Sequence, residues 1–155
     1  MPYSVRGTPT ADHQIAGLRG ARRKAYDQFE QTLARAGCLA LDYRLTGEDP
    51  LPRLCVKHLR GSDRAVVAFT GDDVWVLVVG PHAAGDAAAD VYGALYELAG
   101  VTRPTQPRTK PACCDDDQAP PAFDERRIDD LVRRARLLRR QRPPDLLTAP
   151  TRGRS

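Results

Sequence analysis

Residues 54–79 read LCVKHLRGSDRAVVAFTGDDVWVLVV, and this stretch decides the fold. Three strand-like runs, at 54–59, 64–70 and 74–79, are separated by short segments rich in Gly, Ser and Asp. Strand-forming residues interrupted by such turn residues predict two successive β-hairpins. The third run is apolar on both faces, so it is expected to be a central strand or one covered on both sides. The stretch predicts an antiparallel meander, with helices expected on one side of it.

The chain before these strands has a helical pattern between Ala11 and Gly37. Its apolar residues recur at separations that are mostly three, four or seven: Ile15, Leu18, Ala25, Phe29, Leu33 and Ala36. Gly17 and Gly20 weaken the middle of this stretch, which predicts a break into two helices near Gly20. Gly37 is a natural helix stop, and residues 3–5 are expected to form a short first strand.

The chain after the strands divides into four parts. Residues 90–98 are expected to form a short helix, and residues 102–122, rich in Pro, Thr and charge, a linker. Residues 123–142 are expected to form an amphipathic basic helix, and 143–155 a disordered tail. One apolar stripe of the basic helix is formed by Ile128, Leu131, Val132, Ala135 and Leu138. Strands and helices in this order predict an α+β fold.

The positive charge of the chain lies in its tail. The 155 residues carry a formal charge of +4. Residues 1–102 hold 11 Lys and Arg against 12 Asp and Glu, whereas residues 103–155 hold 13 against 8. The segment that forms the predicted domain is therefore close to neutral, and its total charge gives no support to nucleic-acid binding.

The cysteines and the apolar runs bear on the cellular compartment. The spacing of Cys38, Cys55, Cys113 and Cys114 fits neither a paired zinc motif nor a regular disulfide framework. The adjacent pair could be redox-active, but two ordinary reduced thiols are expected. The N-terminus has no apolar leader, and the longest apolar run is far too short to cross a bilayer. A cytoplasmic protein is expected.

Four motifs in this order resemble the RelE/ParE superfamily of bacterial toxins. VKHLR at 56–60 is similar to the family's basic strand, and RAVVAF at 64–69 to its next strand, which opens with an arginine. VVGPH at 78–82 is similar to the exit of its last strand, and DVY at 90–92 to the tyrosine-bearing segment that follows. The resemblance covers about residues 1–101. It implies a toxin domain with an N-terminal helical hairpin packed on a small antiparallel sheet, to which this chain adds a C-terminal helical extension.

The resemblance also implies a function. Ribonuclease members of the family enter the ribosomal A site and cut the messenger by attack of a ribose 2′-hydroxyl on the adjacent phosphate. This chemistry requires a base, an acid and cations to stabilise the developing charge, and it requires no metal or other cofactor. The implied protein is a type II toxin–antitoxin toxin that acts as a ribosome-dependent mRNA endoribonuclease. Its partners would be a cognate antitoxin, the ribosome and mRNA.

The resemblance assigns four catalytic candidates: His82 as general acid or base, Arg64 on the phosphate, Lys57 as a further cation and Tyr92 to stack on a base or orient the phosphate. Arg64, Lys57 and His82 are expected to converge on one concave face. The RNA-binding candidates are Arg60, His58, Arg22, Arg23 and Lys24. Since neighbours on a strand point to opposite faces, at most one of Lys57 and His58 points into the site.

Structural explanations compete with these roles. His82 could be an ordinary loop residue, Arg64 a solvated hairpin arginine, and Tyr92 could pack with Tyr96 against the sheet. The basic run at 22–24 could be a solvated helix face. Two other functions therefore stay open: a non-enzymatic inhibitor of gyrase with the same fold, and a regulatory or interaction protein that has lost toxicity.

Overall fold

The computed structural model describes residues 3–45, 51, 53–82, 90–102 and 111–141, so the predicted tail at 143–155 lies outside the described residues. In chain order the elements are β1 (Ser4–Gly7), α1 (Pro9–Ala16), α2 (Gly20–Ala36), the 3-10 helix η1 (Gly37–Ala40), β2 (Tyr43–Arg44), β3 (Cys55–His58), β4 (Asp63–Thr70), β5 (Asp73–Pro81), α3 (Val91–Ala99) and α4 (Glu125–Gln141). The predicted helices and strands are present, and β2 is an addition that the sequence did not predict.

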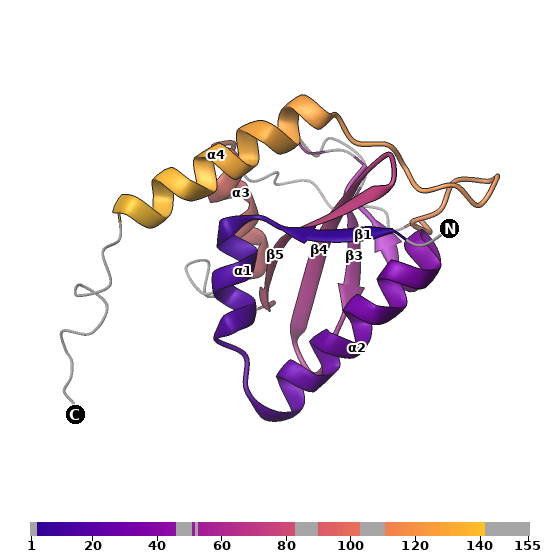
Figure 1. Ribbon diagram of the computed structural model, residues 1–155, viewed down its shortest axis with the longest axis horizontal. Helices are drawn as coiled ribbons and strands as arrows, with labels where there is room; N and C mark the ends of the chain where they lie inside the picture. Colours follow the sequence, from indigo (N-terminus) through magenta and orange to yellow (C-terminus); the bar gives the residue numbers. More distant parts are fainter. Residues whose placement is uncertain (1–2, 46–50, 52, 83–89, 103–110, 142–155) are drawn as a thin grey trace.

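The strands form one five-stranded sheet in the order β1-β5-β4-β3-β2 (Figure 1). The pairs β3–β4 and β4–β5 are antiparallel, which confirms the two predicted hairpins. β1 runs parallel to β5, so the sheet is mixed rather than wholly antiparallel. β5 lies between β1 and β4, and this position explains why its sequence is apolar on both faces. The predicted α+β fold is confirmed.

Helices cover both faces of the sheet, not one face as the sequence suggested. On one face, α1 and α2 bury a core that includes Phe29, Leu33 and Val67. On the other face, α3 and α4 bury a second core that includes Val66 and Leu95. Val66 and Val67 are successive residues of β4, so they point to opposite faces. The register shift at this point leaves Leu77 of β5 without a partner, so both Leu77 and Val78 join the core of the second face. We refer to the second face as the α3 face.

The predicted helical break lies between α1 and α2. The buried Thr8 side chain caps α1 by accepting the Ala11 N–H at 3.0 Å, and its hydroxyl donates to the Leu77 carbonyl at 2.8 Å. This second bond ties the start of α1 to the central strand. Gly37 ends α2 with a φ of +60°, a conformation that favours glycine because it has no Cβ. The predicted stop at this position is confirmed.

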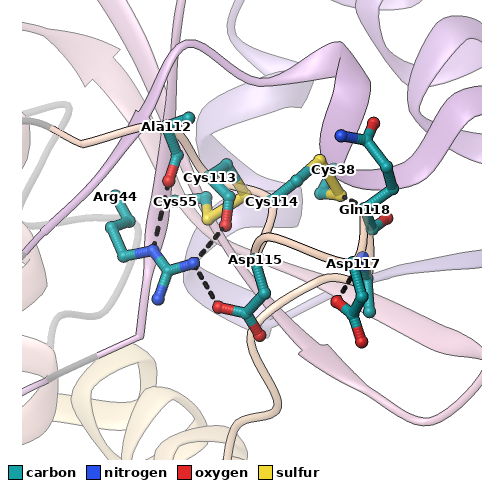
Figure 2. The surroundings of a disulfide bond; sticks show 10 residues. Cys38, Arg44, Cys55, Ala112, Cys113, Cys114, Asp115, Asp117 and Gln118 are labelled. Carbon is teal, nitrogen blue, oxygen red and sulfur yellow. Dashed lines mark hydrogen bonds and ion pairs between the residues drawn. A yellow bond between two sulfur atoms is a disulfide. The ribbon is translucent and has the colours of Figure 1, made fainter.

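The segment at 111–123, which we call the strap, corrects two expectations. Cys38 is bonded to Cys114 and Cys55 to Cys113, so the four cysteines are not reduced thiols (Figure 2). The described part of the predicted linker is therefore fixed to the sheet. The bonded residues are 76 and 58 positions apart in the sequence. Spacing along the chain could not reveal these pairs, because the strap has to fold back before the cysteines meet.

α4 packs through the apolar stripe that the sequence predicted. Ile128, Leu131 and Ala135 are buried in the core of the α3 face. The Arg134 Nε donates to the Leu98 carbonyl at 2.7 Å, at the last turn of α3. Figure 1 shows α4 beside α1 and α3. The helix is thus part of the folded body.

Leu131→Ala is expected to lower the free energy of unfolding by about 2–4 kcal/mol, because it opens a cavity in a core that packs both α3 and α4. Leu137→Ala is the matched control, since Leu137 lies on the same helix and is 47% exposed. Its expected effect is below about 0.5 kcal/mol. Urea unfolding measures both values. Equal effects of the two substitutions would show that α4 is not docked through this stripe.

Candidate functional site

The candidate site lies on the α3 face, where β3, β4 and β5 end. His58 pairs with Arg64 in the β3–β4 register, and Arg64 pairs with Gly80 in the β4–β5 register. Directly opposed residues point to the same face of a sheet. His82 follows Gly80 by two residues, and its N–H donates to the Ser62 carbonyl at 2.8 Å, so it continues the same row. The register therefore gathers His58, Arg64 and His82.

A buried carboxylate orients His82. The His82 Nδ1 lies 2.7 Å from the Asp90 Oδ1, where the Asp90 side chain is 2% exposed and that of His82 is 42% exposed. The other Asp90 oxygen accepts the N–H groups of Tyr92 at 3.1 Å and Gly93 at 3.3 Å, which caps α3. An ionised carboxylate only accepts hydrogen bonds, so the His82 Nδ1 carries the proton. In the neutral imidazole the lone pair then lies on Nε2, the atom required for general-base chemistry.

Two buried tyrosines connect the two histidines. The His82 and Tyr92 rings meet edge to face with their centroids 5.1 Å apart. The Tyr92 and Tyr43 hydroxyls are 2.8 Å apart, and the Tyr43 ring lies edge-on to the His58 ring at 5.5 Å. Tyr92 was expected to stack on a base or orient a phosphate. With only 3% of its surface exposed, it instead forms the floor of the site.

Arg64 lies on this face with its guanidinium over the β3–β4 turn. Its Nη1 donates to the carbonyls of Asp63 at 3.0 Å and Gly61 at 3.3 Å. No carboxylate of the described residues forms an ion pair with it. The side chain is half-buried, and its cross-strand neighbour Gly80 presents no side chain to crowd it. The site therefore holds a positioned cation with its charge uncompensated by a nearby acid.

Lys57 does not join this group, so the predicted convergence of three residues is wrong for Lys57. It pairs with Ala65 in the register, on the face that α2 covers, and its Nζ lies 3.7 Å from the Asp42 Oδ1. It lines a cavity of about 290 Å³ with residues of α2, among them Phe29 and Thr32. The cause is the alternation of side chains along β3, which places His58 at the site and Lys57 away from it.

The basic run on α2 is largely paired within the chain. The Arg22 Nε and Nη2 donate to both oxygens of the buried Asp63 at 2.7 and 2.8 Å, and these hydrogen bonds raise the pKa of Arg22. Arg23 donates to the Asp27 carboxylate at 3.0 Å. Lys24 and Arg60 are exposed. Arg22 thus braces the β3–β4 turn, and its charge is already matched by a carboxylate.

Sequence reasoning missed Asp90 and Tyr43 as parts of the site. Asp90 could have been found from its position, because an aspartate before an apolar helical segment is a typical N-cap. Nothing in the sequence indicated that the same carboxylate also reaches His82. Tyr43 lies in β2, a two-residue strand that is too short to give a periodic signal.

Neither a metal-binding cluster nor a membrane-spanning helix is found in the described ranges. No group of three or more His, Cys, Asp and Glu side chains there is placed to hold a metal ion. None of the helices in these ranges is long and apolar enough to span a membrane.

No protein-family model matches the chain, and no protein with a curated description matches it. Chains of solved structures do match, among them the following two. A chain of the toxin–antitoxin complex RelBE2 from Mycobacterium tuberculosis is 26% identical, with a TM-score of 0.45, over 52% of this chain and 99% of that one. This protein is therefore similar to chains found in RelE toxin–antitoxin complexes. A chain of the archaeal RelE–RelB complex from Pyrococcus horikoshii OT3 is 17% identical, with a TM-score of 0.40, over 55% and 100% of the two chains.

Asp90→Asn is expected to switch the tautomer of His82 while leaving α3 capped. The asparagine oxygen can still accept the N–H groups of Tyr92 and Gly93, which turns its NH₂ toward the His82 Nδ1. The neutral imidazole then carries its proton on Nε2. Imidazole ¹⁵N chemical shifts of the two proteins measure the tautomer. An Nδ1–H form retained in Asp90→Asn would exclude Asp90 as the residue that orients His82.

Proposed function

We propose that this protein is the toxin of a type II toxin–antitoxin system and cleaves mRNA on the ribosome. The observation that carries this proposal is the Asp90-oriented imidazole of His82 on the same sheet face as Arg64. An oriented base and a guanidinium without an ion pair are two of the groups that transesterification of RNA requires. The sequence resemblance to RelE/ParE toxins also implies mRNA as the substrate.

In the proposed reaction the His82 Nε2 removes the proton from a ribose 2′-hydroxyl. The 2′-oxygen attacks the adjacent phosphate, the bond from phosphorus to the 5′-oxygen breaks, and a 2′,3′-cyclic phosphate is formed. Arg64 stabilises the charge that accumulates on the phosphate oxygens. His58, exposed on the neighbouring strand, is the group we assign to protonate the leaving 5′-oxygen. Lys57 has no part in this scheme, because it lies on the other face.

The proposed partners follow from the same scheme. A cytoplasmic toxin of this kind requires a cognate antitoxin and contacts with ribosomal RNA. Residues 1–102 are close to neutral overall, whereas α4 carries exposed arginines, among them Arg126, Arg136 and Arg140. We propose that phosphate contacts come mainly from α4, together with Lys24 and Arg60.

His82→Ala is expected to slow mRNA cleavage by about 10²–10⁴-fold, because it removes the general base. Arg64→Ala is expected to slow it by at least about tenfold, because it removes a donor to the transition-state charge. The measurement is the mapping of messenger 5′ ends in a bacterial cell-free translation system. Codon-phased cuts are expected with the wild type.

Arg35→Ala is the matched control, since it removes an exposed arginine of α2 that has no place in the site. Its cleavage rate should stay within about threefold of wild type. Thermal unfolding of each variant separates loss of chemistry from loss of fold. Intact messenger with a folded, antitoxin-free wild-type protein would refute the nuclease proposal.

A second function is favoured by one observation: Arg22 and Arg23 of α2 are committed to carboxylates of the same chain. These ion pairs neutralise two of the three cations in the basic run at 22–24, which favours a protein target over ribosomal RNA. The alternative is therefore a non-enzymatic inhibitor of gyrase or an interaction protein. A DNA supercoiling assay that shows inhibition while mRNA stays intact would support gyrase as the target.

A further inference from the structure

We propose that the two disulfides form a thiol-controlled clamp, which fixes the strap at 111–123 and thereby the position of β2 at the candidate site. The inference rests on the proposed function in one respect: an enzyme that acts on ribosomes works in the cytoplasm, where dithiols keep most disulfides reduced. There, the oxidation state of these four cysteines is a variable and not a fixed property of the fold.

The clamp is built from two adjacent cysteines that bond to two different elements. Cys113 joins Cys55 in β3, and Cys114 joins Cys38 in η1 (Figure 2). Cys38, Cys55 and Cys113 are buried, whereas Cys114 is partly exposed. A reductant therefore meets the Cys38–Cys114 bond first, through Cys114. The second bond is one residue away, so opening the first exposes the second.

Arg44 is the non-covalent part of the clamp. Its backbone N–H donates to the Pro111 carbonyl at 2.9 Å. Its guanidinium donates to the carbonyls of Ala112 at 3.2 Å and Cys113 at 2.8 Å, and to the Asp115 carboxylate at 2.6 Å. Figure 2 shows these acceptors gathered around the guanidinium beside the two disulfides. The same side chain therefore loses its partners if the strap moves.

β2 transmits this change to the site because it consists of Tyr43 and Arg44 alone. Arg44 holds the strap, and Tyr43 places its hydroxyl 2.8 Å from that of Tyr92 and its ring against His58. Release of Arg44 leaves β2 held by its short pairing with β3 and by the buried Tyr43 side chain. The position of Tyr43, and with it that of His58, then depends on the state of the strap.

The chemistry is thiol–disulfide exchange with a dithiol. One thiolate of the dithiol attacks the Cys114 sulfur, the bond between the Cys114 and Cys38 sulfurs breaks, and Cys38 leaves as a thiolate. The second thiol of the dithiol then displaces Cys114 from the mixed disulfide, and the dithiol becomes a cyclic disulfide. Two electrons pass to the protein, and the two thiolates take up two protons from solvent. The Cys55–Cys113 bond is reduced in the same way by a second dithiol.

Hydrogen exchange of the full chain, with the disulfides intact and after reduction by dithiothreitol, tests the clamp. Alkylation and mass spectrometry confirm that four thiols are free. Exchange of the Arg44 and strap amides is expected to accelerate by about tenfold or more, while amides of β4 and β5 keep their protection. Unchanged protection of the strap would overturn the proposal. Loss of protection in β4 and β5 would also overturn it, because the disulfides would then be staples of the whole fold.

Paired substitutions separate the two bonds. Cys38→Ser with Cys114→Ser is expected to loosen the Asp115 end of the strap while leaving Cys55–Cys113 closed. Cys55→Ser with Cys113→Ser is expected to accelerate exchange of the Arg44 amide, since it frees the segment that Arg44 grips. If these variants do not fold, hydrogen exchange of the wild-type chain before and after reduction still tests the clamp.

The link to the site is measured without any activity. The Hε1 resonance of His58 is expected to shift on reduction, because the Tyr43 ring lies edge-on to it. The resonance of His13, exposed on α1, is the internal control. A released strap with an unmoved His58 resonance would refute the coupling. Absence of mRNA cleavage in both redox states would count against the proposed function only, because the exchange and resonance data do not depend on it.

Discussion

The cross-strand register of β3, β4 and β5 is the constraint on which the candidate site depends. A shift of one residue would move His58 and Arg64 to the face that α2 covers, and would bring Lys57 to the α3 face in place of His58. The β3–β4 turn fixes this register through bonds from the Leu59 N–H to the Asp63 carbonyl and from the Asp63 N–H to the Arg60 carbonyl. Arg22 braces the same turn from α2 by its two bonds to Asp63. An arginine expected to bind RNA thus serves the geometry of the site.

Asp90 joins this register to α3. A buried carboxylate is costly unless donors surround it, and the donors to Asp90 include the His82 imidazole and the N–H groups of Tyr92 and Gly93. The helix N-terminus also favours the negative charge. Because the same carboxylate starts α3 and orients His82, the position of α3 and the direction of the imidazole are set together. Tyr92, in the first turn of α3, then forms the floor beneath His82, and its bonded partner Tyr43 lies against His58.

The sequence was sufficient where local patterns determine structure. Two hairpins with Gly and Asp turns, a helical stretch interrupted by Gly17 and Gly20, and the apolar stripe of α4 all follow from periodicity and turn chemistry. The alternation rule also separated Lys57 from His58, although it could not say which one faces the site. That choice depends on which face α3 covers, and helix placement is a property of the whole chain.

The sequence was insufficient where residues far apart in the chain meet. The disulfides join positions more than fifty residues apart, and Tyr43 reaches Tyr92 across the sheet. Neither contact leaves a local signal, because each requires the strap or α3 to be in place first. The expectation of two reduced thiols at Cys113 and Cys114 rested on spacing, and spacing carries no information on how the strap returns to β3.

Different interactions hold α4 and the strap in place, and this difference limits which parts of the protein respond when the disulfides are reduced. Burial of Ile128, Leu131 and Ala135 holds α4, and a fully buried Leu or Ile side chain contributes about 1.5–3 kcal/mol. The strap buries Cys113 and Phe123 and pairs with β4 through the Phe123 N–H, which donates to the Phe69 carbonyl at 2.8 Å. Its Cys113 end is held further by Arg44 and by two disulfides, each worth about 2–4 kcal/mol. Reduction removes the two disulfides from the strap and none of the contacts that hold α4. The arginines of α4 therefore stay on the body in either redox state, while β2 and the floor of the site respond to the strap.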